Sequence, residues 1–124
     1  MMMFRRLILC LVGAVAMACG GGYPEPRNQL TASEAAVRAA EVAGAQGSPQ
    51  PALHLKLARE QVEIGKGLIR TGENERADWV LRRAESDAEL ALSLAREEAQ
   101  RKKAATAKEE FERLQQSLQQ GPIR

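Results

Sequence analysis

Few residues of this chain could do chemistry, and their spacing does not bring them together. His54 is the only histidine, whereas a zinc site in a protein takes several His or Cys ligands. Asp87 and Glu89 stand two positions apart, which places them on different sides of a helix. The serines lack the Gly-x-Ser-x-Gly context of a nucleophile. The sequence therefore predicts no catalysis, no metal site and no cofactor.

The strongest chemical signal surrounds Cys19. Two arginines at positions 5 and 6 are followed by an apolar run over residues 7–18, which ends Ala-Met-Ala before the cysteine. Small residues at the end of an apolar run are typical of a secretory signal peptide. With the cysteine, the stretch resembles the lipobox of bacterial lipoproteins. The resemblance implies that residues 1–18 are removed and that Cys19 carries acyl chains such as palmitate.

The apolar run has alternative interpretations. A membrane-spanning helix needs about 20 apolar residues, and residues 7–18 supply only 12 before a run of glycines. A buried core helix would need apolar neighbours that the later segments do not provide. Cys10 is the only rival acylation site, and the Leu before it is too large for the pattern. A protein that is secreted or unprocessed is the remaining alternative to the lipoprotein.

The processed chain is predicted to be one small domain with balanced charge. The full chain has 18 Lys and Arg against 16 Asp and Glu, and loss of the two arginines in the signal leaves 16 of each. Nothing in this balance indicates nucleic-acid binding. In residues 19–30, the lipobox resemblance implies an acylated cysteine at the start, and two prolines and three glycines predict that a flexible tether follows it.

Three helical segments are predicted after the tether, at about 31–45, 49–71 and 74–119. A capping box at Thr31 predicts the first start, and a Ser-Pro pair is typical of the second. A Thr-Gly pair marks the turn before the third segment, which then contains no Gly or Pro until Gly121. The fold class is all-α, an antiparallel helical hairpin or three-helix bundle with a long C-terminal helix. We expect a helical domain over residues 31–120 and a tail over 121–124.

Apolar side chains predict which faces of the helices pack. In the second segment they cover about half of the helical wheel, so we expect it to lie between two other helices. This arc contains Leu53, Leu55, Leu57, Ala58, Val62, Ile64, Leu68 and Ile69. Ala58 and Gly65 lie near its middle, where their small size predicts close approach. The third segment begins with a narrow stripe of Ala77, Leu81, Ala84, Ala88, Ala91, Ala95 and Ala99.

A second apolar stripe follows a basic break at residues 101–103. It consists of Ala104, Ala107, Phe111, Leu114 and Leu118, which repeat as the a and d positions of about two heptads. The stripe is rotated by roughly 130° from the first, at 100° per residue, so it cannot face the same neighbour. We predict a coiled-coil partner surface for a second copy or another envelope protein. The alternative is an arm that projects without a partner.

Two further surfaces are candidates for binding. Trp79, Leu90 and Leu94 form a weaker apolar patch, which we expect to cover the first helix, with a partner surface as the alternative. Candidate polyanion contacts are the basic clusters, Arg82, Arg83, Arg101, Lys102 and Lys103. Neighbouring acidic residues weaken the positive potential of these clusters, so a solvated surface is the expected role.

One stretch of the chain resembles a known family. The residues Ala58, Gly72-Glu73 and Ala77, followed by AESDAELA at 84–91, are similar to the bacterial domain-of-unknown-function family numbered 4398. The resemblance covers about residues 51–107. It implies an exported lipoprotein with an Ala-rich helical segment, and it brings no catalytic residues.

These observations predict a lipid-anchored helical protein of the periplasm with a structural or adaptor role. The residue after Cys19 is Gly rather than the Asp that commonly retains lipoproteins in the inner membrane, so the resemblance implies the outer membrane. The alternative function is a periplasmic module that binds peptidoglycan or another anionic polymer of the envelope.

Overall fold

The computed structural model describes residues 22–121, and all the regular secondary structure in this part of the chain is helical. Its elements are α2 (Arg27–Val42), a short 3-10 helix η2 (Ala45–Gly47), α3 (Pro49–Arg70) and α4 (Asn74–Gln119). The all-α prediction is confirmed. The predicted signal peptide, the acylation of Cys19 and the last three residues lie outside the described residues.

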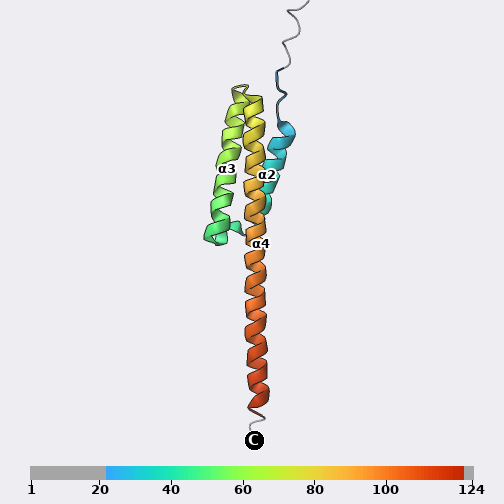
Figure 1. Ribbon diagram of the computed structural model, residues 1–124, viewed down its shortest axis with the longest axis vertical. Helices are drawn as coiled ribbons and strands as arrows, with labels where there is room; N and C mark the ends of the chain where they lie inside the picture. Colours follow the sequence, from blue (N-terminus) through green and yellow to red (C-terminus); the bar gives the residue numbers. More distant parts are fainter. Residues whose placement is uncertain (1–21, 122–124) are drawn as a thin grey trace, which may run out of the picture.

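The three long helices form a bundle around the first half of α4 (Figure 1). α3 returns antiparallel to α4 and shares the largest interface with it, while α2 packs on another side of α4 and touches α3 less. α4 has 46 residues, about 69 Å at 1.5 Å per residue. It therefore extends far beyond α2 and α3, which confirms the prediction of a long C-terminal helix.

The turn between α3 and α4 follows directly from its glycine. Gly72 has φ of +79°, a left-handed conformation that glycine adopts without steric cost. Its N–H donates to the carbonyl of Ile69 at 3.0 Å, and the N–H of Glu73 donates to that of Leu68 at 2.9 Å. These two bonds form a Schellman motif. The motif satisfies carbonyls at the end of α3 and reverses the chain, as predicted.

The predicted capping box at Thr31 is wrong. α2 begins four residues earlier, after Pro26, and the Thr31 hydroxyl donates to the carbonyl of Arg27 at 3.0 Å from within the helix. A proline at a helix start has a suitable φ, and its missing N–H would have had no partner there. Residues 27–30, expected to belong to the flexible tether, are therefore helical.

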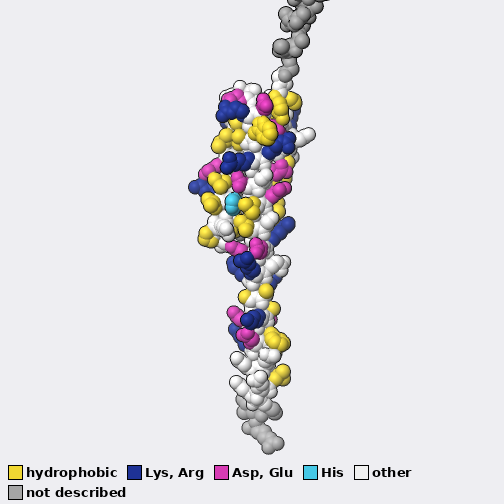
Figure 2. Space-filling view, in the orientation of Figure 1, with side chains coloured by type: hydrophobic (Ala, Val, Ile, Leu, Met, Phe, Trp, Pro, Cys, Tyr) yellow, Lys and Arg dark blue, Asp and Glu magenta, His cyan; other side chains and the backbone are white. Residues whose placement is uncertain are grey.

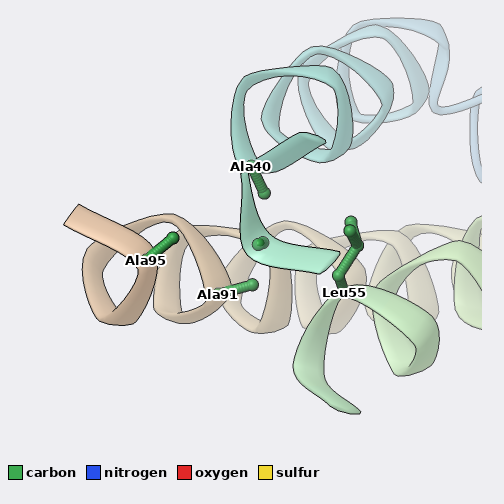
Figure 3. Close-up of a cluster of buried hydrophobic side chains, with 5 residues drawn as sticks. Ala40, Leu55, Ala91 and Ala95 are labelled. Atoms are coloured by element: carbon green, nitrogen blue, oxygen red, sulfur yellow. The ribbon is translucent and has the colours of Figure 1, made fainter. Parts of the chain in front are cut away.

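Alanine dominates the core. A cluster of Ala40, Ala45, Leu55, Ala91 and Ala95 joins α2, η2, α3 and α4 (Figure 3). The predicted stripe on α4 is buried over the rest of its length as well, with the exception of Ala99, which is exposed. Small side chains let three helices approach closely, so this core depends on close packing rather than on large hydrophobic groups.

The packed face of α3 is narrower than predicted. Ala58 and Gly65 are buried, as expected from their place in the arc. A Cβ added at Gly65 would lie 2.6 Å from a methyl carbon of Leu81, so glycine is what permits this contact between α3 and α4. In contrast, Leu53 and Ile64 are each 54% exposed. These leucine and isoleucine side chains lie on a side of α3 that no helix of the bundle covers.

Candidate functional site

The last part of α4 stands apart from the bundle. Every residue from 99 to 121 is exposed, and Figure 1 shows α4 continuing alone beyond α2 and α3. We call residues 99–119 the projecting arm. Figure 2 shows hydrophobic side chains open to solvent along it.

The five residues of the predicted distal stripe all lie on the projecting arm. Phe111 is 60% exposed, Leu114 is 63% exposed and Leu118 is 82% exposed; the two alanines of the stripe are exposed as well. The structure thus brings the predicted partner residues together on one unpaired helix. No other described segment packs against them, because α4 continues beyond the ends of α2 and α3.

Local interactions support the arm as a helix. Arg101 forms an ion pair with Glu97 at 2.6 Å, and Lys108 lies 3.9 Å from Glu112, both at i,i+4 spacing. Pairs of this kind stabilise a helix by about 0.2–0.5 kcal/mol each. The bundle supplies the costly first turns, because α4 is already helical where it enters the arm. The arm can therefore remain helical without tertiary contacts.

The predicted patch of Trp79, Leu90 and Leu94 does not act as a cover for α2. Trp79 is 68% exposed and Leu90 is 43% exposed, whereas Leu94 is partly buried. The side of α4 that faces α2 is identified by a different contact, the hydrogen bond from Gln29 Nε2 to Glu85 Oε2 at 2.5 Å. Two large side chains of the bundle half are therefore left on the surface, as the alternative interpretation requires.

The basic clusters are partly neutralised. Arg82 donates through Nε to Asp78 at 2.8 Å, which raises the pKa of the guanidinium above its ordinary value. Arg101 is paired with Glu97. Arg83 and the lysines at 102 and 103 are exposed. The two clusters lie about 30 Å apart along α4, so the five cations do not form a single site.

A polar cluster that spacing did not reveal lies between α3 and α4. His54 Nδ1 is 3.2 Å from Asp87 Oδ1, and Gln61 Nε2 donates to Asp87 Oδ2 at 2.9 Å. The Oε1 atom of Gln61 is buried without a partner in the described chain. The three residues come from two helices, and no local motif connects them. The His–Asp pair orients an imidazole, but the described hydrogen bonds of the cluster include no nucleophile.

The N-terminal end of the described chain is tied to the start of α4. The hydroxyl of Tyr23 donates to Asp78 Oδ2 at 3.0 Å, and Asn74 Nδ2 donates to the Tyr23 carbonyl at 2.9 Å. The bond to Asp78 raises the pKa of the Tyr23 hydroxyl, because the protonated form donates it. The segment that leads towards Cys19 therefore joins the bundle at the end opposite the projecting arm.

An open groove of about 320 Å³ lies between α2 and α3. Its rim is bridged by Arg59 to Glu41 at 2.5 Å and by Lys66 to Glu34 at 2.8 Å. The carboxylates at 34 and 63 raise the pKa of Lys66. Because the charges at this rim are paired with one another, we interpret the groove as part of the helix packing.

Comparison with known proteins places the chain in a family. Residues 28–110, about two thirds of the chain, match the family described as Domain of unknown function (DUF4398), and the chain belongs to it. The resemblance seen at residues 51–107 is thereby confirmed, over a longer stretch. No curated protein and no solved structure matches the chain. Within residues 22–121 there is no cluster of metal-ligating side chains, and no helix there could span a membrane.

Proposed function

We propose that this member of the DUF4398 family is a lipid-anchored protein of the cell envelope with a structural or adaptor role and no catalytic activity. The observation that carries this role is the projecting arm, a helix with an apolar stripe and no partner in the bundle. Contiguous apolar surface of this kind marks an interaction site. A helical partner laid along the stripe would remove Phe111, Leu114 and Leu118 from water.

The proposed anchor is the acylated Cys19, supported by the lipobox-like sequence before it. Tyr23, four residues later, is held at the first turn of α4. Four extended residues reach about 14 Å, so the anchor would lie near that end of the bundle. The arm lies at the other end of a helix about 69 Å long. We therefore propose a membrane anchor and a partner surface separated by the length of α4, on an outer-membrane protein that faces the periplasm.

The anchor is tested by substitution of each cysteine in the full chain. Cys19→Ala should abolish labelling with a fatty-acid analogue and release the protein from membranes. Cys10→Ala is the matched control and should change neither property. If the Cys19→Ala protein is still labelled and still sediments with the outer membrane, the proposed anchor is wrong.

The adaptor role is tested by capture from detergent-solubilised membranes, with mass spectrometry of the bound proteins. The double substitution Phe111→Asp/Leu114→Asp should remove the bound partner, because it places charge in the apolar stripe. Glu109→Ala/Arg113→Ala, on the opposite side of the same turns, should leave capture unchanged. Identical partner profiles for both variants and the unmodified protein would contradict a role for the arm.

Binding to peptidoglycan remains the alternative function, and the separation of the basic clusters does not favour it. Purified peptidoglycan should retain the protein weakly, without dependence on Lys102 or Lys103. If retention is strong, salt-sensitive and lost in Lys102→Gln/Lys103→Gln, the polymer-binding function replaces the adaptor.

A further inference from the structure

Two exposed apolar residues in the bundle half of α4, Trp79 and Leu90, fall in the heptad register of the arm's apolar stripe. Leu90 precedes Phe111 and Leu118 by 21 and 28 residues, and Trp79 precedes Leu114 by 35 residues. All three separations are multiples of seven. In a helix that supercoils with a partner, residues separated by multiples of seven share one line along the surface. A straight α-helix drifts from such a line by about 20° per heptad, so the two exposed side chains of the bundle half come into line with the arm when α4 supercoils around a partner.

We call this line the α4 seam. It contains every seventh residue from Arg76 to Leu118, as a positions, and every seventh residue from Trp79 to Leu114, as d positions. All of these side chains are exposed. The seam is therefore an uncovered surface that extends over nearly the whole of α4, well beyond the stripe of the arm.

The other helices of the bundle contact α4 away from the seam. Glu85 faces α2 through Gln29, and Asp87 faces α3 through His54. Around the axis of α4, Ala84 lies between the directions of Glu85 and Asp87, and it is fully buried. None of these three positions of α4 belongs to the seam. A further helix can therefore lie along the seam without displacing α2 or α3.

We propose that a second copy of this chain packs along the α4 seam, with its α4 antiparallel to the first. This inference rests on the proposed function in treating α4 as the partner surface, and it names the partner as a second copy. The same residues of both copies then form the interface, as in a two-fold dimer. The two Tyr23 residues lie at opposite ends of such a dimer, so both proposed anchors reach the same membrane when the paired α4 helices lie along its surface.

The charges in the seam favour the antiparallel arrangement. In a parallel, in-register pair each seam residue meets its own copy, so Arg83 would face Arg83 and Glu97 would face Glu97. Like charges at these positions oppose association. In one antiparallel register, seam residues lie opposite each other when their numbers add to 197. Glu97 then meets Gln100 of the second copy. Arg83 meets Leu114, so no seam position has a like charge opposite it.

The sizes of the seam residues fit the same register. Trp79 meets Leu118 of the second copy, so the two most exposed large side chains at the ends of α4 cover each other. Phe111 meets Ser86, a small residue that leaves room for the ring. The overlap covers residues 78–119 of both copies, so the seam is used along almost its full length.

Two kinds of flanking contact in this register are unfavourable: Arg96 lies beside Lys103 of the second copy, and a pair of glutamates distinguishes this register from others. Glu89 lies beside Glu110 of the second copy, and the two-fold axis repeats the contact. In a parallel pair Glu110 would lie beside Gln115 instead. Reversal of the charge at position 110 therefore strengthens the antiparallel dimer and has little effect on a parallel one.

Disulfide cross-linking tests the arrangement in full-length protein purified from membranes in detergent. The antiparallel register places Ser93 opposite Ala104 of the second copy. The double variant Ser93→Cys/Ala104→Cys should form a cross-linked dimer on mild oxidation, while each single variant and the parent should not. Cross-linking of either single variant would show a parallel pair and overturn the proposal. A monomer in sedimentation for the parent and all three variants would overturn the dimer itself.

Sedimentation of charge variants tests the register. Glu110→Lys should lower the dissociation constant on the order of tenfold, because two repulsive contacts become attractive. Glu109→Lys, which makes the same change on the outward side of the arm, should leave it unchanged. Equal dissociation constants for the two variants would overturn the register. If the protein is a monomer and its arm still captures another envelope protein, the dimer is overturned and the proposed function stands. If the Cys19→Ala protein is still labelled and still sediments with membranes, the proposed anchor is overturned and the dimer stands.

Discussion

In the two halves of α4, the half with the smaller apolar residues is buried and the half with the larger ones is exposed. The bundle half is packed through small residues such as Ala84, Ala88 and Ala91, each fully buried. The projecting arm carries Phe111 and Leu114, which are larger and yet mostly exposed. Burial on this helix is thus decided by which helices lie beside it. Small residues allow neighbours to approach, and large ones remain exposed where the chain supplies no neighbour.

This contrast predicts different energetic roles for the two halves. In the bundle half, tertiary packing stabilises the helix, so a change of one or two methylene groups should be felt. In the arm, the interactions within the monomer are local to the helix: hydrogen bonds of the backbone and of two hydroxyl side chains, and a few ion pairs. Local opening of the arm should therefore cost much less free energy than opening of the bundle.

The largest expected difference comes from the same substitution in each half. Leu81→Ala should lower the free energy of unfolding by about 2–5 kcal/mol, because Leu81 is fully buried against Gly65. Leu114→Ala should change it by less than about 0.5 kcal/mol in dilute protein. Chemical denaturation followed by circular dichroism measures both. Similar losses would mean that the arm is packed in solution against something within the same chain.

The reverse substitution sharpens the comparison. Ala84→Leu should overpack the contact between α3 and α4 and cost about 1–3 kcal/mol. Ala104→Leu adds the same atoms on the exposed arm and should not destabilise the monomer. The two thermal unfolding curves should separate clearly. If they coincide, the alanine stripe of the bundle is not the tight contact that its burial indicates.

A smaller, pH-dependent effect is expected where the N-terminal segment meets α4. The bond to Asp78 raises the pKa of the Tyr23 hydroxyl above its ordinary value of 10.0. Its contribution to stability is therefore complete below the pKa of the unfolded chain and is lost as the pH rises through the higher folded pKa. Tyr23→Phe should unfold at a slightly lower temperature at neutral pH. This difference should vanish in strongly alkaline solution, and a constant difference across pH would contradict the assignment.

The smallest effect on the bundle is expected from a break in the arm. Thr106→Pro should disrupt the helix around position 106, because proline removes a hydrogen bond and clashes with the preceding turn. Helical circular dichroism should fall, while the thermal midpoint of the bundle should stay the same. A lowered midpoint would show that the arm contributes to the bundle and that the two halves are not independent.

Most of the helix pattern was predictable because its signals are local. Gly72 and the Ser-Pro pair before α3 act through backbone geometry within a few residues, and both helix ends lie where they predict. The start of α2 was not predictable from the capping box. Thr31 has the right side chain for a cap, but Pro26 already opens the helix and the chain before it is tied to α4.

The candidate binding residues were predictable only in part. The distal stripe was visible because its three-four spacing is continuous over the arm. The alignment of Trp79 and Leu90 with that stripe was hidden, because the bundle half also carries the buried alanine stripe and the seam between them is mostly polar. The His54–Asp87 pair was not visible at all, since the two residues are 33 positions apart on different helices.

Within residues 22–121, the sequence by itself determined the number of long helices, most of their ends and the small-residue face of α4, because turn residues and helical periodicity act over short distances. Only the tertiary structure decided which apolar residues are covered. The apolar arc of α3 predicts burial for Leu53 and Ile64, but α2 packs on another side and leaves them exposed. The same arrangement leaves the α4 seam uncovered. Whether an apolar residue is covered depends on which helices are available and where each one packs. Neither can be read from the residue and its neighbours in the sequence.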